Sequence, residues 1–211
     1  MILPKSFYAR PAVDVAIELI GKVLVRKIGK AVCSGKIVET EAYVGPHDLA
    51  CHASKGKTPR TSVMFGPPGF AYVYMIYGVY YCLNAVTERK GYPAAVLIRA
   101  IEPLDGVDRM RRNRRRADRA ADIGSGPGKL CQALAVDLEL NAASLRGRAL
   151  WIEDRNLNAG SITAGPRIGV DYAREYRDKP WRFFIADNPH VSRHKFNSQG
   201  TIIAGGTSSG C

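Results

Sequence analysis

The chain has 211 residues, of which 31 are Lys or Arg and 19 are Asp or Glu, so its formal net charge at pH 7 is +12. At this length, with 46% hydrophobic residues, we expect one packed domain rather than a disordered chain. No stretch reaches 18 consecutive apolar residues, and no apolar segment follows a basic start, so we expect neither a transmembrane helix nor a secretion signal.

The charge and the cysteines narrow the class of protein further. A large positive excess suggests an anionic partner, and nucleic acid is the first candidate. Basic residues that only maintain solubility would give the same net charge. The five cysteines never form a C-x-x-C pair, so they indicate neither a disulfide framework nor a zinc site and fit a reducing cytoplasm. Cys51 beside His52 lacks further ligands at a suitable spacing, so we expect no metal site and no nucleophilic thiol there.

The first predicted element is a helix between Pro11 and Gly21, which mark its start and its end. Its apolar residues recur at helical spacing: Val13, Ala16, Ile17 and Ile20. Short β-branched or apolar runs then predict strands at residues 23–25, 36–44, 95–101 and 182–186. The aromatic segment 70–86 predicts a hairpin around Tyr77.

The remaining chain predicts a second helix and a change of character at the C-terminus. Pro127 opens this helix, with Leu130, Leu134 and Val136 facing inward. Strands and helices do not alternate regularly, so we predict an α+β fold with a curved, largely antiparallel sheet flanked by helices. We expect residues 1–197 to form the domain and residues 198–211, rich in Gly, Ser and Thr, to form a loose tail.

A polar cluster follows the predicted strand at residues 36–44. With a period of two, Glu39, Glu41 and Tyr43 project to one face of this strand. His47 and His52 follow after a Gly-Pro turn that brings the chain back toward the same strand end. Two carboxylates and a tyrosine on one face suggest acid–base chemistry, whereas a half-exposed strand with a solvated polar face is the structural alternative.

Tyrosines gather in the predicted hairpin. They are Tyr72, Tyr74, Tyr77, Tyr80 and Tyr81. Tyrosine rings offer flat surfaces for stacking bases, although an aromatic hairpin that packs on a sheet would look similar. Tyr77, next to Gly78, falls at the tip, where a protruding ring is a candidate wedge between stacked bases.

Several ordered blocks of this sequence resemble the alkyladenine (3-methyladenine) DNA glycosylase family. They are V-E-T-E-A-Y-V-G-P, H-x-S-x-G-x-T-P-R, Y-V-Y-M-I-Y-G-V-Y-Y-C-L-N, V-L-I-R-A-I-E-P-L and S-G-P-G-K-L-C-Q-A-L. They cover residues 7–136, and a weaker likeness through G-P-R-I-G-V and K-P-W-R-F-F-I extends to about residue 192. The resemblance implies a monofunctional hydrolase of base excision repair that needs no metal or cofactor.

By the same resemblance, the substrate is double-stranded DNA that contains damaged purines. The enzyme flips out alkylated or deaminated purines, such as 3-methyladenine, 7-methylguanine, hypoxanthine or ethenoadenine, and hydrolyses the N-glycosidic bond. The resemblance also implies a monomer without membrane contact, located in the cytoplasm and, in a bacterium, on the nucleoid. The open alternatives are a non-catalytic module that binds lesion DNA or RNA, and a metal-dependent nuclease, for which no ligand cluster is seen.

The resemblance assigns roles in catalysis. Glu41 is the general base that activates the attacking water, and Arg99 helps to hold that water. Glu39, two residues before Glu41, raises the alternative of a paired acid and base, but a salt-bridging or orienting role suits it better.

The resemblance also assigns roles in base recognition. Tyr43, His52 and Tyr74 form walls against which the flipped base stacks. Asn84 screens that base, because an exocyclic amino group like that of guanine would crowd it. Tyr77 enters the minor groove where the nucleotide was.

The basic segment 109–119 holds seven arginines and predicts a mostly solvated helix. It suits non-specific contact with phosphates, with Arg111 and Arg115 as representatives, but a solvated loop would have the same composition. Lys129 lies near a predicted helix start, where backbone N–H groups also favour phosphate. We therefore expect these three side chains to contact the DNA backbone.

Overall fold

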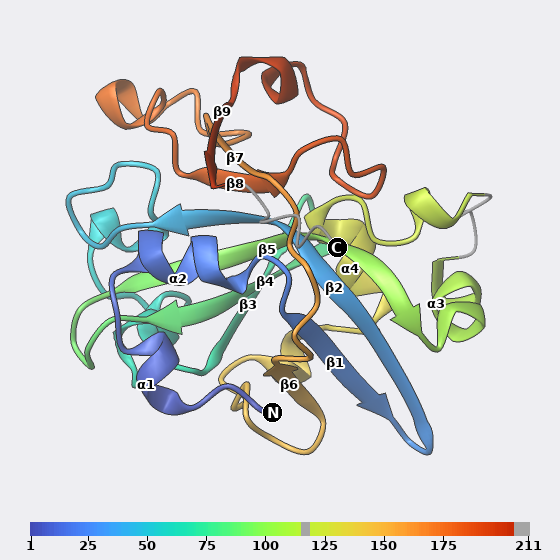
Figure 1. The fold of residues 1–211 in the computed structure, drawn as a ribbon. Coiled ribbons are helices and arrows are strands. Elements are labelled where there is room, and N and C mark those ends of the chain that lie inside the picture. Colours follow the sequence, from blue (N-terminus) through green and yellow to red (C-terminus); the bar gives the residue numbers. More distant parts are fainter. Residues whose placement is uncertain (115–118, 205–211) are drawn as a thin grey trace.

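The chain folds around a single antiparallel sheet (Figure 1), which a computed structural model describes for residues 1–114 and 119–204. The strands of these residues are β1 (Val23–Ile28), β2 (Ala31–Tyr43), β3 (Ala71–Ile76), β4 (Tyr80–Thr87), β5 (Ala94–Asp105), β6 (Leu150–Glu153), β7 (Ile162–Gly165), β8 (Arg182–Ile185) and β9 (Thr201–Ala204). The α-helices are α1 (Lys5–Tyr8), α2 (Ala12–Leu19), α3 (Val107–Arg114) and α4 (Pro127–Ala133). The 3-10 helices are η1 (His52–Lys55), η2 (Ser62–Phe65), η3 (Ala120–Asp122), η4 (Leu138–Leu140), η5 (Arg174–Tyr176) and η6 (Lys195–Gln199).

Strand β2 is the centre of the sheet, whose order is β3-β4-β5-β2-β8-β7-β9 with β1 and β6 branching off. Its first half pairs with β1 and its second half with β8, while β5 pairs with it along most of its length. All of these pairings are antiparallel, so the predicted α+β class with a largely antiparallel sheet is confirmed. Register shifts between β2 and β5 near Glu39 mark an irregularity of the kind that bends strands and redirects side chains.

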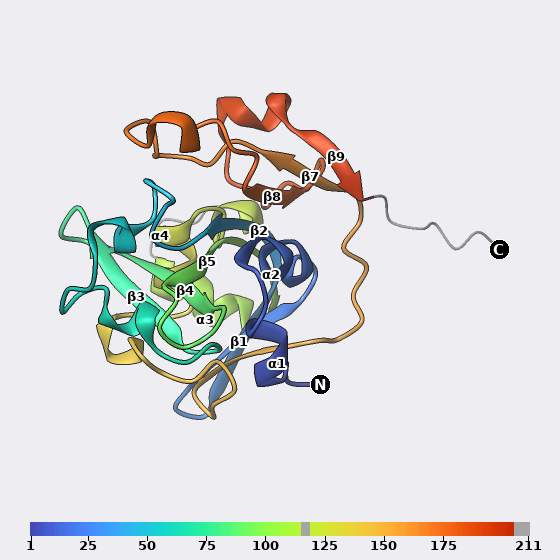
Figure 2. The same ribbon diagram turned by 90° about the vertical axis from the view of Figure 1, so that its left-hand side faces the viewer.

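Helices α2 and α4 lie on opposite faces of the sheet, as Figures 1 and 2 both show. The predicted helix after Pro11 is α2, and Gly21 follows it with a φ of +84°. Its fully buried side chains differ in part from those expected from the pattern; they are Ala12, Val15, Ala16 and Leu19. The helix that begins at Pro127 is confirmed as α4, and Leu130 and Leu134 are buried as predicted.

The predicted hairpin is formed by β3 and β4. Ile76 pairs with Tyr80, and the turn between them places Tyr77 and Gly78 at φ values of +51° and +70°. Two successive positive φ values are typical of the tight turns that join twisted antiparallel strands. Glycine adopts this conformation freely, which explains Gly78, whereas Tyr77 adopts it at some conformational cost.

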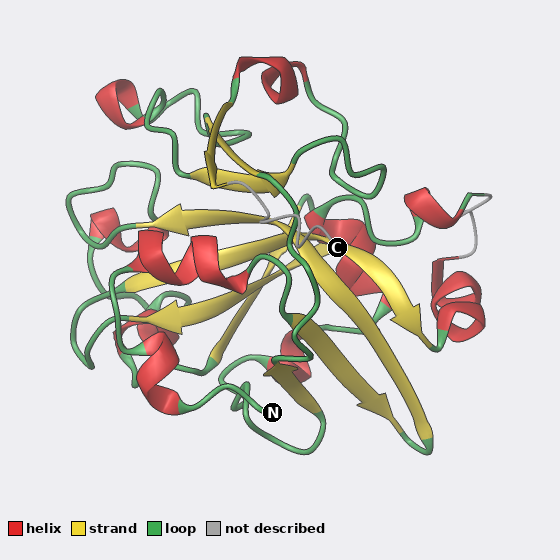
Figure 3. Ribbon diagram, viewed as in Figure 1, coloured by secondary structure: helices red, strands yellow, loops and turns green. Residues whose placement is uncertain are grey.

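The C-terminal part of the chain extends the sheet beyond β2. A segment without regular structure, residues 154–161, runs from β6 to β7, and Figure 3 shows it in green along the outside of the molecule. Part of the segment expected to be a loose tail is ordered, because η6 continues to Gln199 and residues 201–204 pair with β7 as β9. The β-branched residues at 201–203 favour this strand, and residues 205–211 lie outside the described part of the chain. Over the described residues, no helix is long and apolar enough to span a bilayer.

Candidate active site

The two glutamates of β2 project from the face of the sheet opposite α2. Thr40, which lies between them, points the other way, and its hydroxyl donates to the carbonyl of Ala16 in α2 at 2.8 Å. Glu39 and Glu41 are both fully buried, and both contact Arg99 of β5. Side chains along β2 therefore alternate between the two faces of the sheet as expected from the sequence, but the face that carries the glutamates is buried rather than solvated.

Three groups surround the carboxylate of Glu41. The hydroxyl of Tyr43 donates to Oε2 at 2.9 Å, and the backbone N–H of Ile168 donates to Oε1 at 2.7 Å. The Nη1 atom of Arg99 lies 3.3 Å from Oε2. Burial, and next the charge of Glu41, hold the pKa of Tyr43 well above its usual value, so this hydroxyl remains a donor.

Glu39 forms a denser network of hydrogen bonds. Its Oε1 accepts from Nε of Arg99 at 2.8 Å and from Nε of Arg182 at 2.7 Å. The hydroxyl of Ser192 donates to Oε1 at 2.8 Å, and the N–H of Ser192 donates to Oε2 at 2.9 Å. Burial alone would raise the pKa of Glu39, but these two cations and the Ser192 bonds outweigh it and hold the pKa below its usual value. Glu39 is therefore a fully partnered carboxylate.

Arg99 connects the two carboxylates and reaches the cavity described below. Its side chain is 8% exposed. Burial would lower the pKa of this guanidinium, but the charges of Glu41 and Glu39 outweigh that effect and raise its pKa. A permanent cation consequently lies between two carboxylates at the base of the site.

Aromatic rings from η1 and β3 meet beside this polar cluster. The ring centroids of His52 and Tyr74 are 4.6 Å apart with an edge-to-face geometry, and those of Tyr72 and Tyr74 are 5.2 Å apart. The Nδ1 atom of His52 lies 3.1 Å from the hydroxyl of Tyr72, within hydrogen-bond distance. Burial, and next the charge of Arg60, lower the pKa of His52, which favours a neutral imidazole.

A cavity of about 200 Å³ opens among these groups. Six of the residues singled out from the sequence line it: Tyr43, His52, Tyr74, Tyr77, Asn84 and Arg99. Glu41 does not line the cavity itself, but it bonds to Tyr43 and lies beside Arg99, which both do. The structure thus brings the predicted base-recognition residues around one cavity and places the predicted general base directly behind its wall.

Asn84 has a fixed orientation in this wall. Its Nδ2 donates to the carbonyl of Tyr72 at 3.0 Å, across the β3–β4 pairing in which these two residues face each other. Because the side-chain amide is buried and bonded, it presents a defined shape to anything that enters the cavity.

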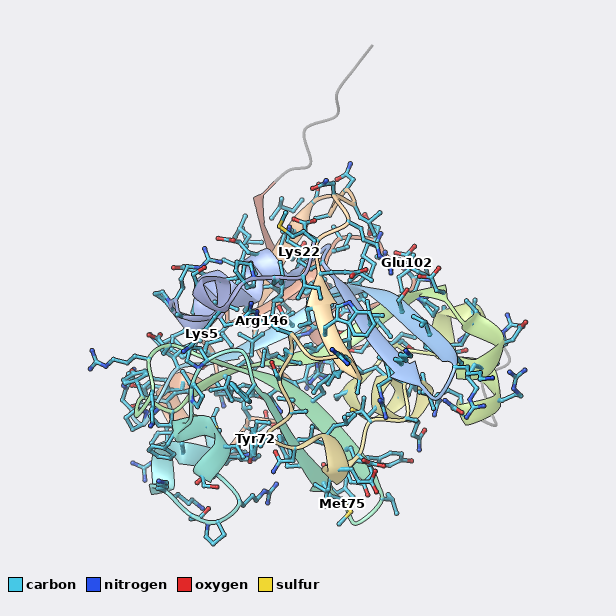
Figure 4. All side chains as sticks on the ribbon, turned by 90° about the horizontal axis from the view of Figure 1, so that it is seen from below. Lys5, Lys22, Tyr72, Met75, Glu102 and Arg146 are labelled. Atoms are coloured by element: carbon cyan, nitrogen blue, oxygen red, sulfur yellow. The ribbon has the colours of Figure 1, made fainter. Side chains whose placement is uncertain are left out.

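Tyr77 stands at the outer end of the hairpin. Its side chain is 88% exposed, although it also borders the cavity. Met75, 42% exposed, precedes it on β3, and Figure 4 shows Met75 nearer the turn than Tyr72. An exposed aromatic ring on a tight turn beside a cavity has the position that a wedge into a base stack requires.

The loop after β7 contributes residues that reasoning from the sequence did not single out. Arg167 forms a buried bidentate pair with Asp48, with Nη–Oδ distances of 2.6 and 2.9 Å. Its guanidinium also packs 4.9 Å from the ring centroid of Tyr43. This anchor holds the loop so that the N–H of the next residue, Ile168, reaches Glu41. Arg167 lies in the G-P-R-I-G-V block, but its partner is 119 residues away in the sequence, which hides the pair.

The basic residues expected to contact DNA lie beyond the cavity. Arg111 is exposed on α3, and Lys129 on α4 is half-buried with its Nζ 3.5 Å from the hydroxyl of Ser125. Helices α3 and α4 are in contact, and Pro127 at the start of α4 lines the cavity. Arg115 falls outside the described residues.

Cys51 is an inert part of the core rather than a reactive thiol. It is buried, its thiol lies 3.7 Å from the carbonyl of Pro93, and burial raises its pKa to about 11. Within residues 1–114 and 119–204, no three His, Cys, Asp or Glu side chains gather in a group able to hold a metal ion.

Comparison with known proteins identifies the family. The model of the methylpurine-DNA glycosylase family matches residues 6–189, which is most of the chain. The chain therefore belongs to this family, whose members are DNA-repair hydrolases that cleave N-glycosyl bonds.

Curated relatives cover nearly the full length of both chains. A protein of Methanocella arvoryzae is 52% identical over 193 residues, which are 91% of this chain and 96% of the relative. A protein of Alkaliphilus oremlandii is 46% identical over 202 residues (92% and 100%), and one of Myxococcus xanthus is 48% identical over 192 residues (90% and 93%). Each of the three is named "Putative 3-methyladenine DNA glycosylase".

Proposed function

We propose that this protein is a monofunctional DNA glycosylase that acts as a monomer on double-stranded DNA. It flips out alkylated or deaminated purines and releases them by hydrolysis of the N-glycosidic bond. The observation that carries this proposal is the aromatic cavity lined by Arg99, with Glu41 directly behind that arginine, in a protein that carries a net charge of +12. The family and the names of the relatives support the same activity.

The purine must leave the duplex before water reaches its bond to the sugar, at a cost of a few kcal/mol. Tyr77 fills the gap in the base stack and slows the return of the nucleotide. Inside the cavity, the base stacks on Tyr43 and Tyr74, beside His52. Stacking on aromatic faces contributes about 1 to 3 kcal/mol per base, which offsets much of the cost of flipping.

Cleavage develops positive charge on the sugar, as in other glycoside hydrolyses. The carboxylate of Glu41 stabilises that charge and accepts a proton from the attacking water. Arg99 lies 3.3 Å from Glu41, where its charge favours the ionised carboxylate and its N–H groups help to hold the water. Tyr43 and Ile168 fix the direction of the carboxylate through their hydrogen bonds.

The lesions that suit the site are purines such as 3-methyladenine, 7-methylguanine, hypoxanthine and ethenoadenine. Damaged or mispaired bases leave the stack more easily than normal ones, which supplies part of the selectivity. Asn84 supplies another part, because its bonded amide crowds the exocyclic amino group of guanine and leaves room for hypoxanthine. 7-Methylguanine keeps that amino group, and its release relies instead on its positive charge, which makes it a better leaving group than guanine.

The test is the release of free base from duplexes that contain 3-methyladenine or hypoxanthine. In Glu41→Gln we expect base release to fall by at least 100-fold, as for loss of a general base, with binding of the lesion duplex retained. Glu18→Gln is the matched control, since Glu18 is an exposed carboxylate on α2 paired with Arg10. Unchanged release by Glu41→Gln would remove Glu41 from the mechanism, and binding without release by the unaltered protein would indicate the non-catalytic module instead.

A further inference from the structure

Arg60 is the last residue of the H-x-S-x-G-x-T-P-R block, and the proposed function gives it no role. Its guanidinium carbon lies 5.1 Å from the ring centroid of Tyr74. Tyr74 lines the cavity, whereas Arg60 is exposed and is not among the residues that line it. The guanidinium therefore stands outside the cavity, close to one of its aromatic walls.

The loop that carries Arg60 is braced on both sides of it. The backbone N–H of Thr58 donates to the hydroxyl of Thr61 at 2.9 Å, and the N–H of Thr61 donates to the hydroxyl of Thr58 at 3.2 Å. The Thr61 hydroxyl also donates to the carbonyl of Gly56 at 3.2 Å. These bonds explain the conformation of the loop but not the choice of an arginine at its tip.

The charge of Arg60 acts on the aromatic walls of the cavity. It is the second cause, after burial, that lowers the pKa of His52. Burial raises the pKa of Tyr72, and the charge of Arg60 opposes that increase. Positive potential from this one side chain thus extends over neighbouring walls of the same cavity.

The part of the cavity wall formed by Tyr43 differs in its charge balance. Arg167 stacks on Tyr43 at 4.9 Å, but the bidentate pair with Asp48 compensates its charge. None of the ion pairs formed within the described residues involves Arg60. Arg60 therefore adds net positive charge beside the cavity, whereas Arg167 does not.

We propose that Arg60 is a specificity-determining residue that disfavours positively charged purine lesions relative to neutral ones. The inference rests on the proposed function. A purine methylated at N7 of guanine or N3 of adenine carries a positive charge while it is attached to the sugar, whereas hypoxanthine is neutral. A cation near Tyr74 repels a charged base and weakens the attraction between that base and the electron-rich face of the ring.

The experiment compares single-turnover release of 7-methylguanine and of hypoxanthine from duplexes of otherwise identical sequence. In Arg60→Gln we expect the ratio of the 7-methylguanine rate to the hypoxanthine rate to rise about threefold over that of the unaltered protein at low salt. The increase should shrink at about 0.5 M salt, because the charge of an exposed side chain is then screened within a few ångströms.

Two control variants separate charge from other effects. Arg60→Lys keeps the charge and should keep the original ratio. Lys57→Gln removes another exposed cation of the same loop, 6.0 Å from the ring of Phe65, which does not line the cavity, and should also leave the ratio unchanged.

An equal loss of both activities in Arg60→Gln would overturn the inference, because it would make Arg60 a general contact to the DNA backbone. If Arg60→Gln releases both bases with the same ratio of rates as the unaltered protein, this inference is wrong, while the proposed function stands. If the unaltered protein releases neither base, the proposed function fails, and the inference fails with it.

Discussion

Arg99 is oriented by Glu39, whose Oε1 accepts from Nε of the guanidinium at 2.8 Å. The proposed mechanism assigns no proton transfer to Glu39. Its carboxylate instead fixes the guanidinium so that the Nη1 atom lies 3.3 Å from Glu41. Arg182 adds a second cation to Glu39, so two buried carboxylates are matched by two buried arginines. The orientation of the proposed general base, Glu41, therefore depends on Glu39, two residues earlier in the strand, through Arg99.

Glu39→Gln should destabilise the protein and slow base release together. Removal of one partner from a buried ion pair costs about 3 to 5 kcal/mol, because the remaining charges stay buried without compensation. Denaturation in urea measures the loss of unfolding free energy, and single-turnover assays measure the rate. Ser192→Ala removes one hydroxyl bond to the same carboxylate and should cost only about 1 kcal/mol. Equal stability of the two variants would show that the ion pair does not hold the site.

Tyr77→Ala should weaken the binding of lesion DNA more than it slows single-turnover cleavage at saturating protein. Loss of one stacked ring costs about 1 to 3 kcal/mol, which corresponds to an increase in Kd of about 5- to 150-fold. Because Tyr77 is 88% exposed, the melting temperature should not change. Tyr77→Phe keeps the ring and should bind like the unaltered protein. An unchanged Kd for Tyr77→Ala would exclude the wedge.

Lys129→Ala and Arg111→Ala should each reduce the salt dependence of DNA binding. A side chain that neutralises one phosphate contributes about one unit to the slope of log K against log salt. This slope is measured by titrating a lesion duplex with protein at salt concentrations between about 50 and 200 mM, where log K falls roughly linearly with log salt. Lys5→Ala on α1 is the control, and its slope should be unchanged. A variant that keeps the full slope has lost no phosphate contact.

The protein should be less stable at pH 5.5 than at pH 7.5. Burial, the largest cause for each, lowers the pKa of His52, His190 and His194. Below the unfolded pKa of about 6.5, the unfolded chain binds more protons than the folded one, so stability falls as the pH decreases. Melting temperatures at the two pH values test this. The difference should become smaller in His52→Asn, and an equal or higher melting temperature at pH 5.5 contradicts the prediction.

Local patterns were enough to predict the central elements of the fold. The β-branched run with alternating glutamates specified β2 and the common direction of Glu39 and Glu41. The Tyr-Gly pair specified the β3–β4 turn with its exposed Tyr77. These features depend on strand periodicity and turn chemistry, which act over a few residues and are therefore visible in the sequence.

Contacts between distant segments could not be predicted in the same way. Ile168 and Ser192 bond to Glu41 and Glu39 across 127 and 153 residues, and both of these bonds are donated by a backbone N–H, which no side-chain pattern signals. Strands β6, β7 and β9 are four residues each, too short for a clear period; β8 has the same length, but its consecutive apolar residues Phe183, Phe184 and Ile185 made it predictable. The Arg167–Asp48 pair could not be predicted either, because a buried arginine shows in the sequence only as one more basic residue.

The distance in sequence between the glutamates and their partners has a consequence for synthesis of the protein. A ribosome completes β2 early, but the N–H of Ile168 and the side chains of Arg182 and Ser192 follow much later. Until then, Glu41 has only Tyr43 and Arg99 beside it and Glu39 has only Arg99, so both carboxylates lack part of the contacts that fix their direction. A nascent or truncated chain that ends before residue 168 lacks the N–H that bonds to Glu41, and it also lacks part of the cavity lining, which includes Ile168, Gly169, Val170 and Tyr172. Interrupted translation should therefore yield fragments that do not create abasic sites in the genome.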